Sequence, residues 1–196
     1  MTNRIIKTPA EIFPIWFNFS YDLAAGIFIQ NYELTCVDKA DGVDSKPTII
    51  LSDVLSSPEV MVVVRAGSEG EVHQITCRGL TGGGSFYDRE LLLEIKTVVT
   101  DDFTKQPNDA FLFEVEFDRR LIPGDSLASA EATGIDEATG LSVAGINVFE
   151  PTVSGSNVGV PVLGGANMRS YLIGVLGTTA AGYVYEKVIR MSVREL

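Results

Sequence analysis

The chain has a single histidine, His73, the side chain best able to act as an acid or base near neutral pH. A catalytic histidine needs a nucleophile beside it and an acid that orients it. No sequence motif around His73 supplies either group, and the residue 98 positions later is Tyr171. The sequence therefore predicts no hydrolytic site at His73.

Two further stretches contain residue types that bind phosphate or metal. A predicted strand follows the glycines at 82–84, whereas a phosphate loop leads into a helix and usually carries a lysine, so we interpret them as a hairpin turn. Asp38, Asp41 and Asp44 lack the alternate-position oxygen pattern of a calcium loop. We expect a solvated acidic loop there, and no catalytic, cofactor or metal site in the chain.

The two cysteines, Cys36 and Cys77, both lie in the first half of the chain on predicted strands. A disulfide between the two sheets of a sandwich is geometrically possible. However, Gly134 and Val175 occupy the corresponding positions in the second half. The fold therefore does not require a bridge, and free buried thiols are favoured, although the sequence alone leaves the pairing open.

A segment in which apolar and polar residues alternate occurs twice in the chain, and it predicts the strand around which each half is built. Its apolar members in the first copy are Phe13, Ile15, Phe17, Phe19 and Tyr21, and in the second Phe111, Phe113, Val115 and Phe117. Such alternation places one set of side chains on a buried sheet face and the other toward water. Each run ends in Leu-x-x-Gly, at 23–26 and 121–124, where glycine allows a tight turn.

The whole sequence repeats with an offset of 98 residues, which is half of its 196. Without a gap, the offset pairs Val60, Val62 and Val64 with Val158, Val160 and Val162, and Gly79, Thr81, Gly84 and Tyr87 with Gly177, Thr179, Gly182 and Tyr185. Agreement in register over this distance indicates a tandem duplication. We therefore predict two domains, residues 1–98 and 99–196.

Short predicted strands separated by turns fill each copy, and no convincing amphipathic helix is found. In the first copy they cover residues 27–37, 48–52, 60–64, 72–78 and 86–96, and each has a counterpart in the second. This spacing is typical of an all-β sandwich, and about 100 residues is the size of an immunoglobulin domain. The predicted fold is two tandem immunoglobulin-like β-sandwiches related by a gapless 98-residue duplication. The short join at 97–103 favours a stiff pair.

The charge of the chain excludes several classes of partner. With 26 Asp and Glu against 15 Lys and Arg, the net charge is −11. Nucleic-acid binders present a basic face, and anionic membranes attract basic segments, so neither partner is expected. No apolar run approaches the roughly 20 residues of a transmembrane helix, and residues 1–11 lack the features of a signal peptide. We expect a protein made in the cytoplasm without export.

The two copies differ in the side chains predicted to point outward. Trp16, Met61 and Val63 are in the outward phase of the first copy. Their counterparts are Glu114, Gly159 and Pro161. Exposed apolar patches mark contact sites, so we predict a protein interface at these three residues. The alternative is that a neighbouring segment of the same chain covers Trp16.

The sequence resembles a group of small virion proteins of tailed phages, described as structural or fibre–tail adaptor proteins with immunoglobulin-like domains. The resemblance is carried by the alternating strand after Pro9 and Pro107, by Leu-x-x-Gly, by the hairpin with Tyr87-Asp88-Arg89 or Tyr185-Glu186-Lys187, and by the ending at 193–196. It implies a non-enzymatic docking or spacer element at the tail, neck or capsid surface. The expected partners are other virion proteins, the expected location is the virion, and several copies would be arranged symmetrically.

Two other functions remain open at this point. A host-surface or carbohydrate-binding module would use Trp16, Tyr32 or Tyr87 to stack on sugar rings. An aromatic cluster lining a groove beside polar groups would favour that function, whereas a flat apolar patch would favour protein docking. An enzyme would need a polar constellation that the sequence does not reveal.

Overall fold

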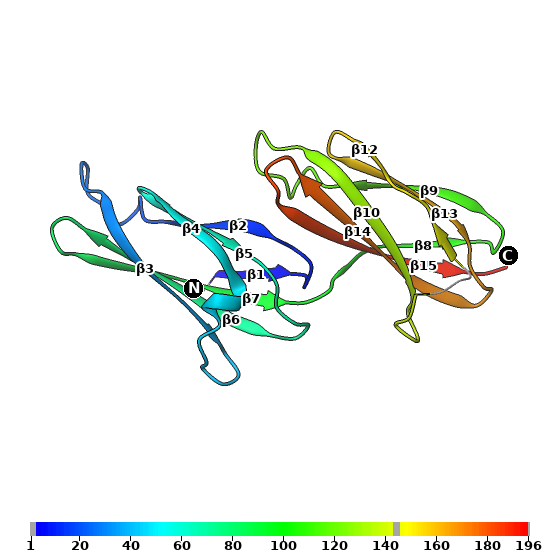
Figure 1. Ribbon diagram of the computed structural model, residues 1–196, viewed down its shortest axis with the longest axis horizontal. Helices are drawn as coiled ribbons and strands as arrows, with labels where there is room; N and C mark the ends of the chain where they lie inside the picture. The colour runs from blue at the N-terminus through cyan, green and yellow to red at the C-terminus, as the bar shows by residue number, and fades with distance from the viewer. Residues whose placement is uncertain (1–2, 143–145, 196) are drawn as a thin grey trace. The chain divides into compact units, whose positions relative to one another are not determined.

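The computed structural model describes residues 3–142 and 146–195, and it is nearly all-β (Figure 1). The chain divides into two compact units, Met1–Thr97 and Val98–Leu196, hereafter unit 1 and unit 2. The boundary predicted from the sequence lies one residue later than this division.

Unit 1 is a sandwich of two sheets. Its strands are β1 (Asn3–Lys7), β2 (Phe13–Asn18), β3 (Ile29–Asp38), β4 (Ile50–Ser56), β5 (Glu59–Val64), β6 (Val72–Thr81) and β7 (Phe86–Ile95). One sheet has the order β1-β7-β6-β3, with β1 parallel to β7, and the other has the order β2-β5-β4. The second, fifth and fourth strands thus face the third, sixth and seventh, which is the division of an immunoglobulin fold.

Unit 2 repeats this arrangement. Its strands are β8 (Val99–Lys105), β9 (Ala110–Glu116), β10 (Leu127–Asp136), β11 (Ile146–Val148), β12 (Thr152–Ser154), β13 (Asn157–Gly164), β14 (Arg169–Thr179) and β15 (Val184–Val193). One sheet has the order β10-β14-β15-β8, and in the other β13 pairs with β9, β11 and β12. Two short strands, β11 and β12, stand where unit 1 has β4. The predicted class of two tandem immunoglobulin-like sandwiches is confirmed.

The strand bounds follow the 98-residue offset of the sequence. Strands β3 and β10 begin and end 98 residues apart, and so do β7 and β15. One repeated contact explains a repeated glycine. A Cβ on Gly79 would lie 2.9 Å from Cδ1 of Ile29, and one on Gly177 would lie 2.9 Å from Cδ2 of Leu127, the residue 98 positions after Ile29. Both of these side chains are buried, so each glycine makes room for the first residue of β3 or β10.

Two kinds of element were missed in the sequence. The four-residue helix α1 (Lys46–Ile49) is too short to show a helical period. Strands β1 and β8 were predicted as a terminus and a join. Each is an edge strand with a single parallel partner, β7 or β15, so it needs no strict alternation to be stable. The predicted join at 97–103 is therefore mostly strand.

Each unit also contains a buried lysine that the sequence analysis did not identify. The Nζ atom of Lys7 donates to the carbonyl oxygens of Thr8 and Ala66, at 2.7 and 2.6 Å. Lys105, 98 residues later, donates in the same way to Gln106 and Gly164, at 2.7 and 2.6 Å. Burial lowers the pKa of Lys105. Lys7 thus links the turn after β1 to the segment after β5, and Lys105 links the turn after β8 to the end of β13.

Candidate functional site

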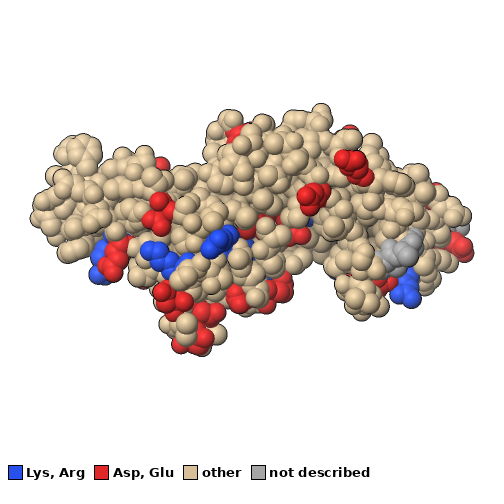
Figure 2. All heavy atoms as spheres, in the orientation of Figure 1, with Lys and Arg blue, Asp and Glu red and all other residues tan. Residues whose placement is uncertain are grey.

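The aspartates of residues 38–44 stabilise their own loop. The side chains of Asp38, Asp41 and Asp44 accept hydrogen bonds from the backbone N–H groups two residues later, at 2.7, 2.9 and 3.0 Å. Such contacts are typical of Asx turns. Figure 2 shows acidic side chains at the tip of the loop between β3 and α1. Among the described residues, no three His, Cys, Asp or Glu side chains are grouped so that they could hold a metal ion.

His73 has the neighbours that the sequence did not reveal. Its Nδ1 atom lies 3.0 Å from the hydroxyl of Ser45, and its Nε2 atom lies 3.2 Å from a carboxylate oxygen of Glu71. The Ser45 hydroxyl also contacts the thiol of Cys36, at 3.3 Å. Ser45, Glu71 and His73 border a cavity of about 190 Å³. No sequence motif revealed the Ser45 hydroxyl beside His73, because β6 and the loop before α1 meet only in the folded chain.

The geometry of this network nevertheless favours a structural role. His73 is 2 % exposed, and both of its ring nitrogens already have a polar neighbour. The hydroxyl of Ser45 lies between the imidazole and a buried thiol. The backbone carbonyl of Ser45 accepts hydrogen bonds from the N–H groups of Thr48 and Ile49, at the start of α1. The backbone N–H of Ser68, with a further contribution from His73, lowers the pKa of the Glu71 carboxyl. The network joins β3, α1 and β6.

Replacing Ser45 with alanine should therefore lower the free energy of unfolding of unit 1 by about 1–2 kcal/mol. The reason is that a buried ring nitrogen of His73 loses its partner. Chemical denaturation followed by the emission of Trp16, the only tryptophan, measures this change. Ser20→Ala, at an exposed position, is the control and should change stability by less than about 0.5 kcal/mol. Equal stability of both variants would contradict the role assigned to Ser45.

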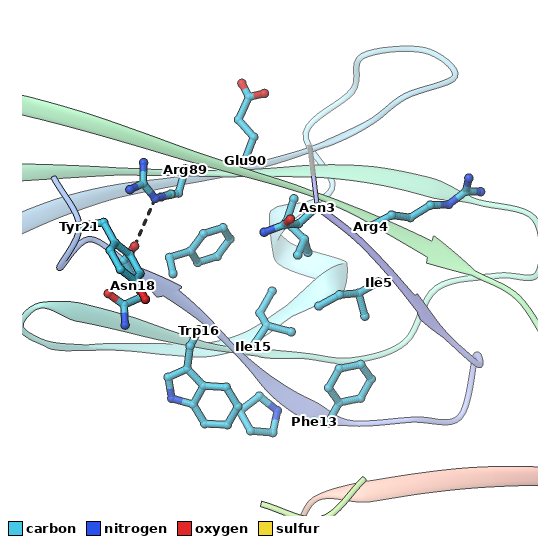
Figure 3. Close-up of a pocket in the computed structure, with 13 residues that line it drawn as sticks. Asn3, Arg4, Ile5, Phe13, Ile15, Trp16, Asn18, Tyr21, Arg89 and Glu90 are labelled. Carbon is cyan, nitrogen blue, oxygen red and sulfur yellow. Dashed lines mark hydrogen bonds between the residues drawn. The ribbon is translucent and has the colours of Figure 1, made fainter. Parts of the chain in front are cut away.

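A groove of about 730 Å³ opens between β1 and β2 of unit 1 (Figure 3). It is lined by Asn3, Arg4, Ile5, Phe13, Pro14, Ile15, Trp16, Phe17, Asn18, Tyr21, Arg89, Glu90 and Leu91. Strand β2 forms one wall, and Ile15 and Trp16 project on opposite sides of it. The groove thus lies between the two sheets and has both apolar and polar walls, with Trp16 on its outer rim.

The three predicted interface residues differ in exposure. Trp16 is 46 % exposed, so the alternative that a neighbouring segment covers it is not found, and Met61, opposite it on β5, is half-buried. Val63 is only 5 % exposed, so its prediction was wrong. It lies on the central strand of its sheet, between Pro14 of β2 and Ser52 of β4. A short side chain at that place is shielded by both neighbours.

Unit 2 is less polar at the corresponding surface than the sequence suggested. Leu112 and Phe111 are 57 % and 47 % exposed. Phe111 was predicted to be buried, but it stacks on Phe103 of β8 with ring centroids 5.7 Å apart, at the side of the sandwich. The centre of the strand agrees with the prediction, because Glu114 is exposed where unit 1 has Trp16.

Strand β2 also presents free backbone groups, because it pairs with β5 on one side only. The N–H of Phe19 bonds to the carbonyl of Pro58, at 3.0 Å, which continues the register of the two strands. Antiparallel pairs alternate between bonded and non-bonded residues. Phe13, Ile15 and Phe17 therefore bond to β5, and Pro14, Trp16 and Asn18 direct their backbone groups to the open side.

One of these open groups has a partner within unit 1. The carbonyl oxygen of Asn18 accepts a bond from Nε of Arg89, at 3.2 Å (Figure 3). Arg89 is held in place by an ion pair with Asp22. The N–H and C=O of Trp16, the N–H of Asn18 and the C=O of Pro14 remain as the bonding groups of this edge. We call residues 14, 16 and 18 the β2 edge.

The aromatic residues considered for sugar stacking do not gather in the groove. Tyr32 lies on β3, where its hydroxyl donates to Asp53 of β4. Tyr87 lies on β7 and is half-buried. Tyr21 lines the groove and is 94 % exposed, but it lies on the other side of β2 from Trp16 (Figure 3). No common aromatic platform is formed by these four side chains.

Comparisons with known proteins add little to this description. No family model matches the chain, and no curated protein matches it. Among solved structures, it is similar to the titin domains Z1Z2 in complex with telethonin, with 8 % identity, 98 % of this chain and 92 % of that chain covered, and a TM-score of 0.32. It is also similar to the I-band fragment I67–I69 from titin, with 11 % identity, 98 % and 63 % covered, and a TM-score of 0.33.

The fold is therefore assigned from the strand order given above. A tandem immunoglobulin-like fold is typical of structural and protein-interaction domains. Within the described residues, no helix has the length and hydrophobicity needed to span a bilayer.

Proposed function

We propose that the chain is a non-enzymatic structural protein of a tailed-phage virion, and that the β2 edge with Trp16 is its assembly contact. It would act as a docking or spacer element at the tail or neck, as a fibre–tail adaptor or collar, or on the capsid surface. The resemblance of its repeated strands and hairpins to small phage virion proteins supports the location. The tandem sandwiches support a structural role.

The observation that supports an assembly contact is the exposed β2 edge. An exposed strand edge is a template for pairing with another chain, and proteins usually block such edges with charge. The counterpart edge in unit 2 follows that rule with Glu114 and Glu116. In β2, a half-exposed tryptophan stands at the position of Glu114. Tryptophan is enriched among the residues that carry binding energy in protein interfaces.

The non-enzymatic part of the proposal rests on the geometry around His73. Ser45 is the hydroxyl that a serine-reactive fluorophosphonate would label if the network with His73 and Glu71 were a hydrolytic site. We expect no labelling of the native chain, because the hydroxyl is held between a buried imidazole and a buried thiol. Labelling that is lost in Ser45→Ala would contradict this part of the proposal.

Replacing Trp16 with alanine should lower incorporation of the chain into particles by about tenfold or more, because the contact loses an aromatic side chain that assembly would bury. The stability of unit 1 should change little, since the indole is half-exposed. The measurement is immunoblotting of gradient-purified particles from cells that carry only the variant gene, with stability measured in parallel by circular dichroism.

Phe86→Ala is the matched control, because Phe86 is an exposed aromatic residue of unit 1 outside the groove, 63 % exposed. It should leave incorporation unchanged. Equal incorporation of the wild type and Trp16→Ala would exclude the β2 edge as the contact. Absence of the wild-type chain from purified particles would exclude the virion role itself.

One observation favours the second candidate, a host-surface or carbohydrate-binding module. Tyr21 is almost fully exposed at one end of the groove, close to the polar side chains of Asn18 and Arg89. Aromatic rings beside polar groups suit sugars. A glycan-array screen tests this function, and binding that is lost in Tyr21→Ala but kept in Trp16→Ala would favour it over protein assembly.

A further inference from the structure

The free groups of the β2 edge are complementary to themselves. In an antiparallel pair of two β2 strands centred on Trp16, Trp16 of one copy lies opposite Trp16 of the other, and Pro14 lies opposite Asn18. The two Trp16 residues then exchange both of their N–H···O bonds. The N–H of Asn18 bonds to the carbonyl of Pro14 on each side.

This register places the two backbone groups that cannot bond across the pair, the nitrogen of Pro14 and the carbonyl of Asn18, opposite each other. Proline has no N–H, so the carbonyl opposite Pro14 receives no bond across the pair. That carbonyl belongs to Asn18, and it already accepts a bond from Arg89 within its own unit. Every backbone group of residues 14, 16 and 18 is therefore satisfied. A shift of two residues that places Pro14 opposite Trp16 leaves the tryptophan carbonyl without a donor.

The side chains of β2 suit the same pairing. From Phe13 to Phe17 the strand carries no charge, so no like charges meet when two copies of it pair. On the outer face the two half-exposed indoles become direct neighbours, and on the inner face Ile15 lies opposite Phe17. Aromatic and β-branched pairs directly opposite each other stabilise a sheet.

The open edge of β9 in unit 2 is not suited to self-pairing. Its phase is the same, because the N–H of Phe117 bonds to the carbonyl of Ser156, at 2.9 Å. The residue at the centre of its open edge is Glu114, so self-pairing would place two carboxylates directly opposite each other. Like charges in that position destabilise a pair of strands. The charge pattern therefore favours self-pairing through unit 1 and opposes it through unit 2.

We propose that a second copy of this chain is the partner of the β2 edge. Two copies associate about a two-fold axis by antiparallel pairing of their β2 strands, centred on Trp16, which joins the two β2-β5-β4 sheets into one six-stranded sheet. This inference rests on the proposed function, since it names the occupant of the same contact. An isologous contact of this kind gives a closed dimer.

The solution mass of the full chain, measured by light scattering over a concentration series, tests the pairing. The wild type should change from monomer to dimer, and the dimer should become tighter with added salt because the copies carry like net charge. Trp16→Glu should weaken the dimer at least about 100-fold by placing carboxylates opposite each other. The matched control is Leu112→Glu, at the exposed edge of β9, which should leave the dimer unchanged.

A cysteine at the centre of the pair tests the register. Bonded antiparallel partners have Cα atoms about 5.5 Å apart, which suits a disulfide. Trp16→Cys should therefore form a covalent dimer under mild oxidation. Met61→Cys should not, because its two copies are three strand spacings apart, about 14 Å. Cys36 and Cys77 are buried and free, so they should not compete in the native chain.

The outcomes separate the pairing from the proposed function. A wild type that stays monomeric, together with no covalent dimer of Trp16→Cys, overturns self-pairing. If Trp16→Ala still loses incorporation into particles, the contact stands and a different virion protein occupies it. A dimer that persists in Trp16→Glu also overturns the pairing. A dimer that forms as expected, in a chain that never enters particles, retains the pairing and overturns the virion role.

Discussion

Phe117→Ala should lower the free energy of unfolding of unit 2 by about 3–5 kcal/mol, the usual cost of removing a buried phenylalanine ring. The ring of Phe117 is fully buried, and it packs beside Gly177, whose added Cβ would lie 3.5 Å from the ring. Alanine would leave a cavity between the two sheets of that unit. The loss is a large share of the stability of a domain of this size.

Two probes can assign the loss to one unit. Trp16 is the only tryptophan and lies in unit 1, so its emission reports on unit 1, whereas far-ultraviolet circular dichroism reports on both. Phe117→Ala should shift only part of the dichroism transition, and Phe19→Ala should shift the emission transition. Phe111→Ala, at a half-exposed ring, is the control and should have a much smaller effect. Emission and dichroism that shift together in both variants would show that the units unfold as one.

Stability should also fall steeply at alkaline pH. Burial, followed by the nearby Asp53 and Asp88, raises the pKa of the Cys77 thiol from 9.0 to about 12. Burial and then the hydrogen bond to Asp53 raise the pKa of the Tyr32 hydroxyl to about 12. Both groups stay protonated in the folded chain at pH values where the unfolded chain has released their protons. Their contribution is complete below about pH 9 and is lost as the pH rises through 12.

For Cys77 alone, the loss between pH 8 and pH 11 is about 2–3 kcal/mol, since each unit of pKa difference corresponds to about 1.4 kcal/mol. Urea denaturation at a series of pH values measures it. Cys77→Val is the matched variant, because Val175 occupies the equivalent, fully buried position of unit 2. Its loss of stability between pH 8 and pH 11 should be smaller by about 2–3 kcal/mol, because only the contribution of Tyr32 to this range remains of the two. An equally steep fall in the variant would show that the thiol is not responsible.

The fold was predictable because most of its strands are buried on one face only. The alternation in β2 and β9 and the 98-residue offset were enough to predict two sandwiches and most strand bounds within a few residues. The missed elements lack that alternation: β1 and β8 are parallel edge strands, and α1 is a single turn. The buried Lys7 and Lys105 were also missed, since a lysine that bonds to carbonyls leaves no apolar pattern.

The candidate site was only partly predictable. Alternation alone placed Trp16 outward, and the structure agrees. It also placed Val63 outward, but alternation reports the face of a sheet and not the shielding by neighbouring strands. The β2 edge itself could not be found in this way, because a pattern of side chains does not say which strands pair. The contact between Ser45 and His73 depends in the same way on segments that meet only in the folded chain.

The most direct test of the β2 edge as an assembly contact is amide hydrogen exchange, resolved by residue, on the dilute chain and on its assembled form. The N–H groups of Trp16 and Asn18 face the open side of unit 1, and those of Glu114 and Glu116 face the open side of unit 2. All four should exchange rapidly in the dilute chain. Assembly should protect Trp16 and Asn18 strongly and leave Glu114 and Glu116 unprotected. Rapid exchange at Trp16 and Asn18 in the assembled form would contradict the account.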